Sequence, residues 1–234
     1  MANWTARAAC LLAALVLAGC DDPFGGPPSV APASSITATG GATVSQRVQQ
    51  LRADQNALTS GVMAQVNQLQ ALRTSIAGEA RSYNTDVSQI TSRLSVGTTP
   101  ANPELVGRWN SAQNHLDKIT GDIGGLNSLA TQVTTQASVA GHLLDTIRST
   151  YNVGGAVDED HRHLRQIEAE TNRTMQSIDR LIGELNGEIS RQNAFLAAER
   201  ANLAGLSYGV SAGRLGGGPA TAGAPRPYPG RRTN

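Results

Sequence analysis

Histidine and carboxylate side chains gather in one short run of the sequence, residues 158–163, which reads DEDHRH. On a helix, Glu159 and His163 stand four residues apart and share a face, as two ligands of a divalent metal ion would. His161 points to another side of that helix, and His142 lies off the apolar stripe of the preceding helix. Because no third ligand is provided, we predict no metal site and interpret the run as the acidic first turn of a helix.

No enzyme chemistry is indicated elsewhere in the sequence. No nucleophile, base and orienting group come together by spacing, and no glycine-rich loop is followed by lysine. Cysteine–histidine spacings typical of zinc sites do not occur either. The sequence therefore predicts no catalytic residue, no cofactor and a non-enzymatic role.

Four polar residues interrupt the apolar stripes of the predicted helices: Gln55, Gln65, Gln192 and Glu199. Polar residues at such positions fix the register or the oligomeric state of helical bundles. We interpret them as polar layers, and self-association of the chain stays open. Trp109 and Tyr151, at the two ends of the second stripe, are interpreted as core or end-plug residues.

Composition argues against two further classes of protein. The 234 residues include 19 Lys plus Arg and 18 Asp plus Glu, so no excess of positive charge is available to bind nucleic acid. Only 3% of the residues are aromatic, which is too few for the core of an ordinary compact enzyme of this length.

The beginning of the sequence has the pattern of an export signal. Arg7 precedes an apolar run over residues 8–18, and small residues follow, which is typical of a secretory signal peptide. The run is too short to span a bilayer, which requires about 20 apolar residues. We therefore expect residues 1–19 to be removed as a signal peptide.

The end of that run, Leu17-Ala18-Gly19-Cys20, resembles the lipobox of bacterial lipoproteins. The resemblance implies that signal peptidase recognises Leu17, Ala18 and Gly19, and that Cys20 becomes the first residue and carries a diacylglyceryl group. Acyl chains would anchor the protein in a membrane on the periplasmic side of the bacterial envelope. Cys10 would leave with the signal peptide, so the mature chain could form no internal disulfide.

Two aspartates, Asp21 and Asp22, directly follow the cysteine. In similar lipoproteins of enteric bacteria an aspartate at this place favours retention in the inner membrane, which gives these residues a sorting role by resemblance. The whole segment 20–42 consists mainly of Pro, Gly, Ser, Ala and Thr, and this composition predicts a flexible tether.

Apolar residues recur at steps of three and four over three long stretches, which predicts helices at about 43–95, 103–151 and 158–206. Thr43 and Gln46 match a capping box, and Asn102 precedes a proline as a typical helix start does. The second stripe is apolar at every position along its length.

Three helices of similar length joined by short loops predict an all-α fold, an elongated antiparallel three-helix coiled-coil bundle running up-down-up over residues 43–206. Disordered segments are expected on both sides, the tether and a tail over residues 207–234. An odd number of helices places the two ends of the chain at opposite ends of the bundle, about 75 Å apart at 1.5 Å per residue.

The predicted tail is rich in Gly, Pro and Ala and contains four arginines but no acidic residue. These arginines could contact an anionic partner such as peptidoglycan, phospholipid or lipopolysaccharide, or simply be solvated. They are Arg214, Arg226, Arg231 and Arg232.

Residues 155–162 (GAVDEDHR) and 191–194 (RQNA) are similar to the helical stalk of some proteobacterial lipoproteins. Those proteins carry an OmpA-like peptidoglycan-binding domain after the stalk, for which the low-complexity residues after Leu206 leave no room. The resemblance thus implies a stalk, and it favours the outer membrane, against the indication from Asp21.

Together these patterns lead to the hypothesis of a lipid-anchored, non-enzymatic spacer or adaptor of the cell envelope, which meets an envelope protein or an anionic surface at its distal end. The alternative is an accessory binding subunit of a transport, secretion or flagellar assembly. In that alternative the first helix pairs with a partner, because its stripe is interrupted where the second is not.

Overall fold

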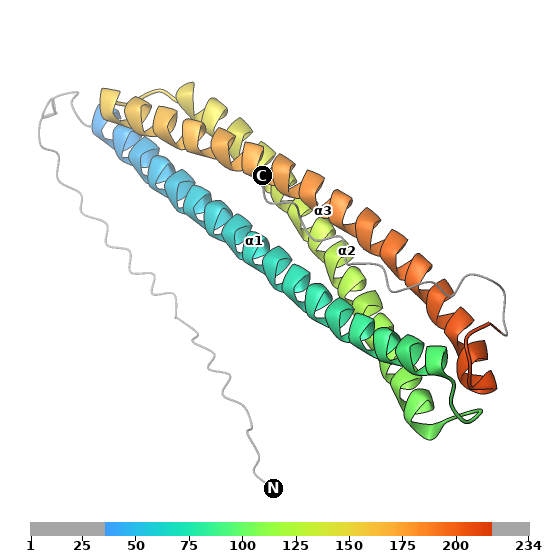
Figure 1. Ribbon diagram of the computed structural model, residues 1–234. Coiled ribbons are helices and arrows are strands. Elements are labelled where there is room, and N and C mark those ends of the chain that lie inside the picture. The colour runs from blue at the N-terminus through green and yellow to red at the C-terminus, as the bar shows by residue number, and fades with distance from the viewer. Residues whose placement is uncertain (1–35, 217–234) are drawn as a thin grey trace, which may run out of the picture. The chain divides into compact units, whose positions relative to one another are not determined.

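The computed structural model describes residues 36–216, with side chains from residue 43 onward. Several predicted site residues therefore lie outside the described part of the chain: Leu17, Ala18, Gly19, Cys20, Asp21, Asp22, Arg226, Arg231 and Arg232. The described residues form three long helices and no strand, α1 (Ile36–Val96), α2 (Pro103–Tyr151) and α3 (Asp158–Ala212) (Figure 1). The predicted all-α fold is confirmed.

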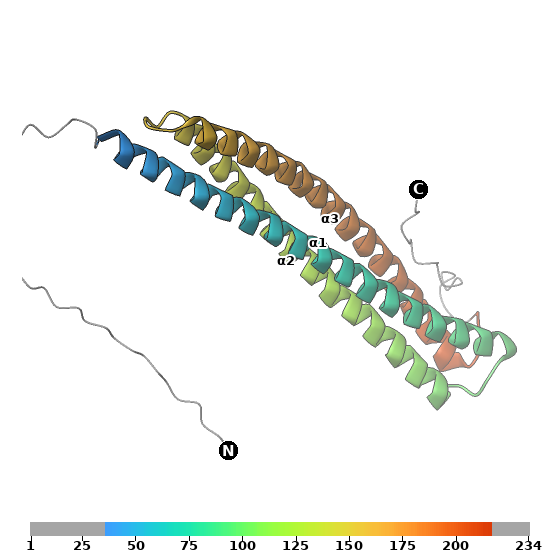
Figure 2. The same cartoon turned by 90° about the vertical axis from the view of Figure 1, so that its left-hand side faces the viewer.

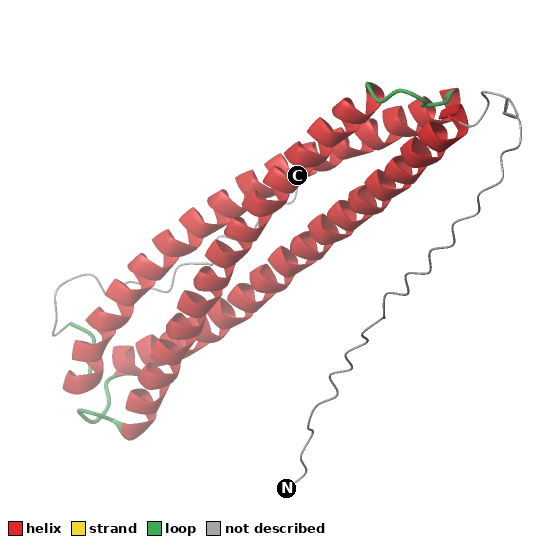
Figure 3. Ribbon diagram, turned by 180° about the vertical axis from the view of Figure 1, so that it is seen from behind, coloured by secondary structure: helices red, strands yellow, loops and turns green. Residues whose placement is uncertain are grey.

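The helices run up, down and up, so that α2 is antiparallel to both of its neighbours and α1 is parallel to α3 (Figures 1 and 2). Every pair of helices is in contact, although α1 and α3 meet less extensively than either meets α2. We call the end with the α2–α3 loop the proximal end and the end with the α1–α2 loop the distal end (Figure 3). The first residue of α1 lies at the proximal end and the last residue of α3 at the distal end.

Local sequence explains where α2 begins. The side-chain oxygen of Asn102 accepts a hydrogen bond from the backbone N–H of Glu104 at 2.9 Å, and Pro103 occupies the first turn. An unpaired N–H is thereby satisfied, and proline is tolerated because it has no N–H to satisfy. The helix ends at Tyr151, as the sequence predicts.

Two helix boundaries differ from the prediction. The helix α1 already begins at Ile36, so Thr43 lies inside it and the predicted capping box is wrong. At the other boundary, α3 continues past Leu206 to Ala212, because Val210 is buried in the core and Gly213 is the residue that ends the helix. Burial of one further turn outweighs the low helix propensity of Gly209.

The core consists of the predicted stripes, which face one another along the whole bundle. Burying one leucine or isoleucine contributes about 2 kcal/mol, so the stability is spread over many layers. Trp109 and Tyr151 pack against this core as half-buried residues, and Trp109 Nε1 donates to the carbonyl of Leu203 at 2.9 Å. The largest fully buried side chains are Tyr83, Leu51, Leu69, Ile76, Ile90, Leu94, Leu105, Leu116, Ile119, Leu126, Leu129 and Ile147.

None of the helices in the described range 36–216 has a stretch that is long and apolar enough to cross a membrane.

Candidate functional site

The charged run of residues 158–163, at the start of α3, makes contacts within the fold. His163 Nε2 lies 3.2 Å from a carboxylate oxygen of Glu159, and the ring of His161 stacks on Tyr151 at a centroid distance of 6.0 Å. The buried Asp160 accepts hydrogen bonds from Ser45 Oγ at 3.0 Å and from the backbone N–H of Val157 at 3.2 Å. Within residues 36–216, no three His, Cys, Asp or Glu side chains are grouped to hold a metal ion.

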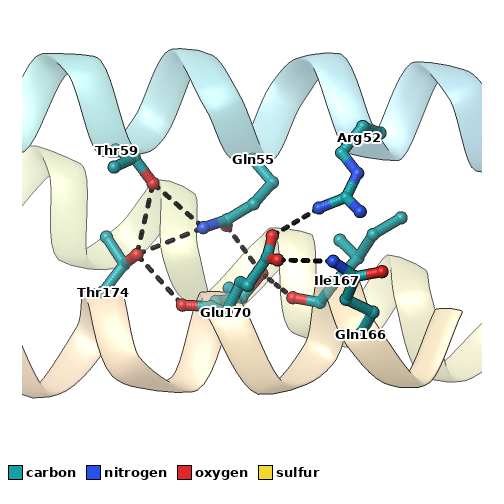
Figure 4. A network of polar contacts seen from close by, with 8 residues as sticks. Arg52, Gln55, Thr59, Gln166, Ile167, Glu170 and Thr174 are labelled. Carbon is teal, nitrogen blue, oxygen red and sulfur yellow. Dashed lines mark hydrogen bonds and ion pairs between the residues drawn. The ribbon is translucent and has the colours of Figure 1, made fainter. Parts of the chain in front are cut away.

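The predicted polar residue Gln55 lies at the centre of a proximal layer in the core (Figure 4). Its Oε1 accepts from Thr171 Oγ1 at 2.7 Å. Its Nε2 donates to Thr174 Oγ1 at 3.1 Å and to Thr59 Oγ1 at 3.0 Å. Every polar atom of the Gln55 side chain therefore finds a partner, which is what makes a buried amide tolerable.

The rim of the proximal layer is charged. Arg52 of α1 pairs with Glu170 of α3, and Gln166 Nε2 also donates to this carboxylate at 3.0 Å (Figure 4). Thr174 Oγ1 donates to the main-chain carbonyl of Glu170 at 3.0 Å. The pair of Arg52 and Glu170 thus joins α1 to α3, and the other two contacts hold Glu170 and Thr174 in place within α3.

A middle layer surrounds the buried Glu188. Arg73 Nε of α1 donates to this carboxylate at 3.1 Å, Arg191 at 2.7 Å and Gln192 Nε2 at 2.6 Å. Arg73 also contacts Glu184 at 3.1 Å. Burial raises the pKa of Glu188, but the hydrogen bonds from Gln192, Arg191 and Arg73 outweigh burial and hold the pKa below its ordinary value.

A distal layer consists of Tyr83, Glu199 and Asn202, all buried. The Tyr83 hydroxyl lies 3.0 Å from Oε2 of Glu199 and 3.0 Å from the carbonyl of that residue, and Asn202 Nδ2 donates to Oε2 at 3.1 Å. Burial, reinforced by the charge of Glu199, raises the pKa of Tyr83 far above its ordinary value. Among the described residues, no cation pairs with Glu199.

A charged cluster between α1 and α2 is not predicted by the sequence stripes. Nδ1 of His115 lies 2.5 Å from Glu79, and Nε2 of the same ring lies 3.8 Å from Asp86. Lys118 adds a contact of 3.4 Å to Glu79, and Arg108 one of 3.5 Å to Asp86. The hydrogen bond from His115, helped by Lys118, holds the pKa of Glu79 below its ordinary value against the effect of burial.

Three of the four predicted polar-layer residues thus lie in layers with defined polar partners. Gln65 is also buried, and its Oε1 has no hydrogen-bond partner. Gln55 of the proximal layer, Glu188 of the middle layer and Glu199 of the distal layer are shielded from solvent and bind side chains of a neighbouring helix, an arrangement that serves alignment.

No protein-family model, curated protein or solved structure matches this chain.

Arg214, which the sequence predicts to contact an anionic partner, lies at the distal end, directly after the end of α3. The end of α3 and the residues after it contact the α1–α2 loop and the end of α1, and three hydrogen bonds between main-chain groups hold them there. Thr98 N donates to the carbonyl of Gly213 at 2.8 Å, Ala101 N to Val210 at 3.0 Å, and Leu215 N to Leu94 at 3.2 Å. Residues that are more than 100 positions apart thereby meet at one end of the bundle.

Proposed function

We propose that this protein is a lipid-anchored, non-enzymatic spacer or adaptor on the periplasmic side of a bacterial envelope. The observation that carries the proposal is that α1 starts and α3 ends at opposite ends of the bundle (Figure 1). If Cys20 holds the proximal side in a membrane, the distal end can lie about 75 Å away, the length of a 49-residue helix such as α2 at 1.5 Å per residue.

The packing of α1 also supports a bundle that is complete by itself. Gln55, one of the residues that interrupts the stripe of α1, is matched by Thr171 and Thr174 of the same chain. The alternative of an accessory subunit then favours a partner on the outside of the bundle or at an end, because a partner that replaced α3 beside α1 would leave these polar groups without their bonds.

Anchoring is tested by comparing the wild-type protein with Cys20→Ala in fractionated cells. We expect the wild-type chain in a membrane fraction, with acyl chains on Cys20 detected by mass spectrometry, and the variant in the soluble periplasm. A wild-type chain that is not acylated, or that stays in the cytosol, would contradict the proposal. The same fractionation decides between the inner membrane, which Asp21 favours, and the outer membrane, which the stalk resemblance favours.

The adaptor role is tested by photo-crosslinking from the two ends of the bundle in living cells. Val96 at the distal end and Val153 in the proximal loop are both well exposed, at 83% and 50%. We expect envelope components to be captured from position 96 and different neighbours from position 153. Identical products from both positions would contradict a bundle that connects two places.

A further inference from the structure

The distal end exposes two aliphatic and two cationic side chains that come from distant parts of the sequence. Arg93 and Val96 lie in the last turn of α1, and Arg214 and Leu215 follow the end of α3. The hydrogen bond from Leu215 N to the carbonyl of Leu94 brings the two segments together at 3.2 Å. We call these four residues the distal patch.

The charges of the distal patch are not neutralised within the described part of the chain. Neither Arg93 nor Arg214 forms an ion pair with a described residue, whereas Arg52 and Arg73 each bind a carboxylate of α3. The carboxylate of Glu104, at the same end, is already bound by Arg108 at 3.2 Å. Two cations are therefore available for an external anion.

The sequence that follows the distal patch is also basic. Residues 217–234 contain Arg226, Arg231 and Arg232 and no aspartate or glutamate. Because each basic residue near an anionic bilayer adds to the attraction, Arg93 and Arg214 of the distal patch suit an anionic surface.

The exposed aliphatic side chains of the distal patch favour a phospholipid membrane over peptidoglycan as the anionic surface. Val96 is 83% exposed and Leu215 is 38% exposed. Aliphatic groups beside cations can enter the boundary between lipid headgroups and acyl chains, where their contact with water ends. A carbohydrate–peptide network such as peptidoglycan offers no such boundary to them.

We infer that the distal patch binds the surface of an anionic phospholipid membrane. The inference deepens the proposed spacer role and depends on it only for the position of the anchor. With Cys20 in one membrane and the distal patch on another, the bundle would join two lipid surfaces.

The test is co-sedimentation of the soluble chain 21–234 with phospholipid vesicles. The packed core lies within residues 36–216, so this chain retains the bundle. We expect binding to vesicles that contain phosphatidylglycerol, weakened by salt, and little binding to vesicles of phosphatidylcholine alone. Each of Arg93→Gln and Arg214→Gln should weaken binding about fivefold, and Val96→Ser should weaken it further.

A matched control lies away from the distal end. Arg173 is exposed and forms no ion pair with a described residue, and Val66 is 48% exposed. The double variant Arg173→Gln/Val66→Ser removes the same kinds of groups at another place and should change binding less than twofold. Circular dichroism of every variant checks that the helices are retained.

Several results would overturn the inference. These are equal binding to both kinds of vesicle, a control variant as weak as the patch variants, and binding to purified peptidoglycan without binding to vesicles. Loss of binding only when Arg226, Arg231 and Arg232 are replaced would also overturn it, because the patch itself would then contribute nothing. A chain that is not acylated in cells would contradict the proposed function and leave the vesicle result standing.

Discussion

Gly213 ends α3 in the left-handed conformation, with φ of 71°, and its backbone lies directly against the α1–α2 loop. A Cβ at this position would collide with the carbonyl oxygen of Thr98 and lie 3.0 Å from the nitrogen of Pro100. Both obstacles are backbone atoms, which cannot rotate away. The chain would have to retreat, and the hydrogen bond from Thr98 N to Gly213 would be lost.

The expected cost of Gly213→Ala follows from two contributions. The left-handed conformation costs about 1 kcal/mol for a residue with a Cβ, and loss of a main-chain hydrogen bond adds about 1 kcal/mol. Displacement of the loop adds to this, so we expect the free energy of unfolding to fall by about 2–4 kcal/mol. Denaturant unfolding followed by circular dichroism measures this change.

Gly124→Ala is the matched control. No heavy atom lies within 4 Å of a Cβ built on Gly124, which is inside α2, so alanine there should raise the stability by up to about 1 kcal/mol through its higher helix propensity. The two glycine-to-alanine changes are thus expected to have opposite signs. If Gly213→Ala had the stability of the wild type, the end of α3 could not be seated on the loop as described. Faster hydrogen exchange of the Thr98 amide in this variant would locate the damage.

Three further predictions concern the polar groups inside the bundle. Tyr83→Phe removes a donor from the buried carboxylate of Glu199, and we expect a loss of about 1–3 kcal/mol in denaturant unfolding. Because the pKa of Glu79 is lowered in the folded state, its contribution is present above the ordinary value of 4.5 and is lost as the pH falls through the folded pKa. In the His115→Gln variant, stability should therefore decrease less steeply than in the wild type as the pH is lowered into the acid range. Denaturation midpoints at several pH values measure this difference. Gln55→Leu should cost less than about 1 kcal/mol, because Thr171 and Thr174 also donate to main-chain carbonyls, yet it should permit self-association detectable by analytical ultracentrifugation.

Tyr208 is 55% exposed, so Tyr208→Phe should leave stability within about 0.5 kcal/mol of the wild type; an equal effect of both tyrosine variants would contradict a special role of the distal layer. An acid profile that His115→Gln leaves unchanged would mean that the ring does not hold the Glu79 carboxylate. If the Gln55→Leu protein stayed strictly monomeric, the proximal layer would not be what prevents self-association.

The elements themselves could be predicted from sequence because a heptad stripe is a property of one segment. The second stripe predicted α2 over residues 103–151, which agrees with the structure. The start of α1 and the end of α3 could not be predicted in this way. Val210 lies beyond the glycine at 209, and only burial against the other helices makes a further turn favourable there.

The candidate site was predictable to a smaller degree, since its contacts depend on how the helices are aligned. The stripes identified Gln55 and Glu199 as buried polar residues, but not the threonines or the tyrosine that bind them. Likewise, nothing in the local pattern around Arg93 shows that Arg214 lies at the same end of the bundle, because the backbone pairing at the end of α3 creates that proximity.

The parallel course of α1 and α3 has a mechanical consequence. A pulling force between the start of α1 and the end of α3 would act along the helix axes (Figure 1). Such a load slides the helices past one another, so the ion pairs of Arg52 and Arg73 with α3 resist it at the same time. A force that separated neighbouring helix ends would instead break these contacts one after another. The bundle is therefore arranged to carry tension along its length, as a tie between two anchored points must.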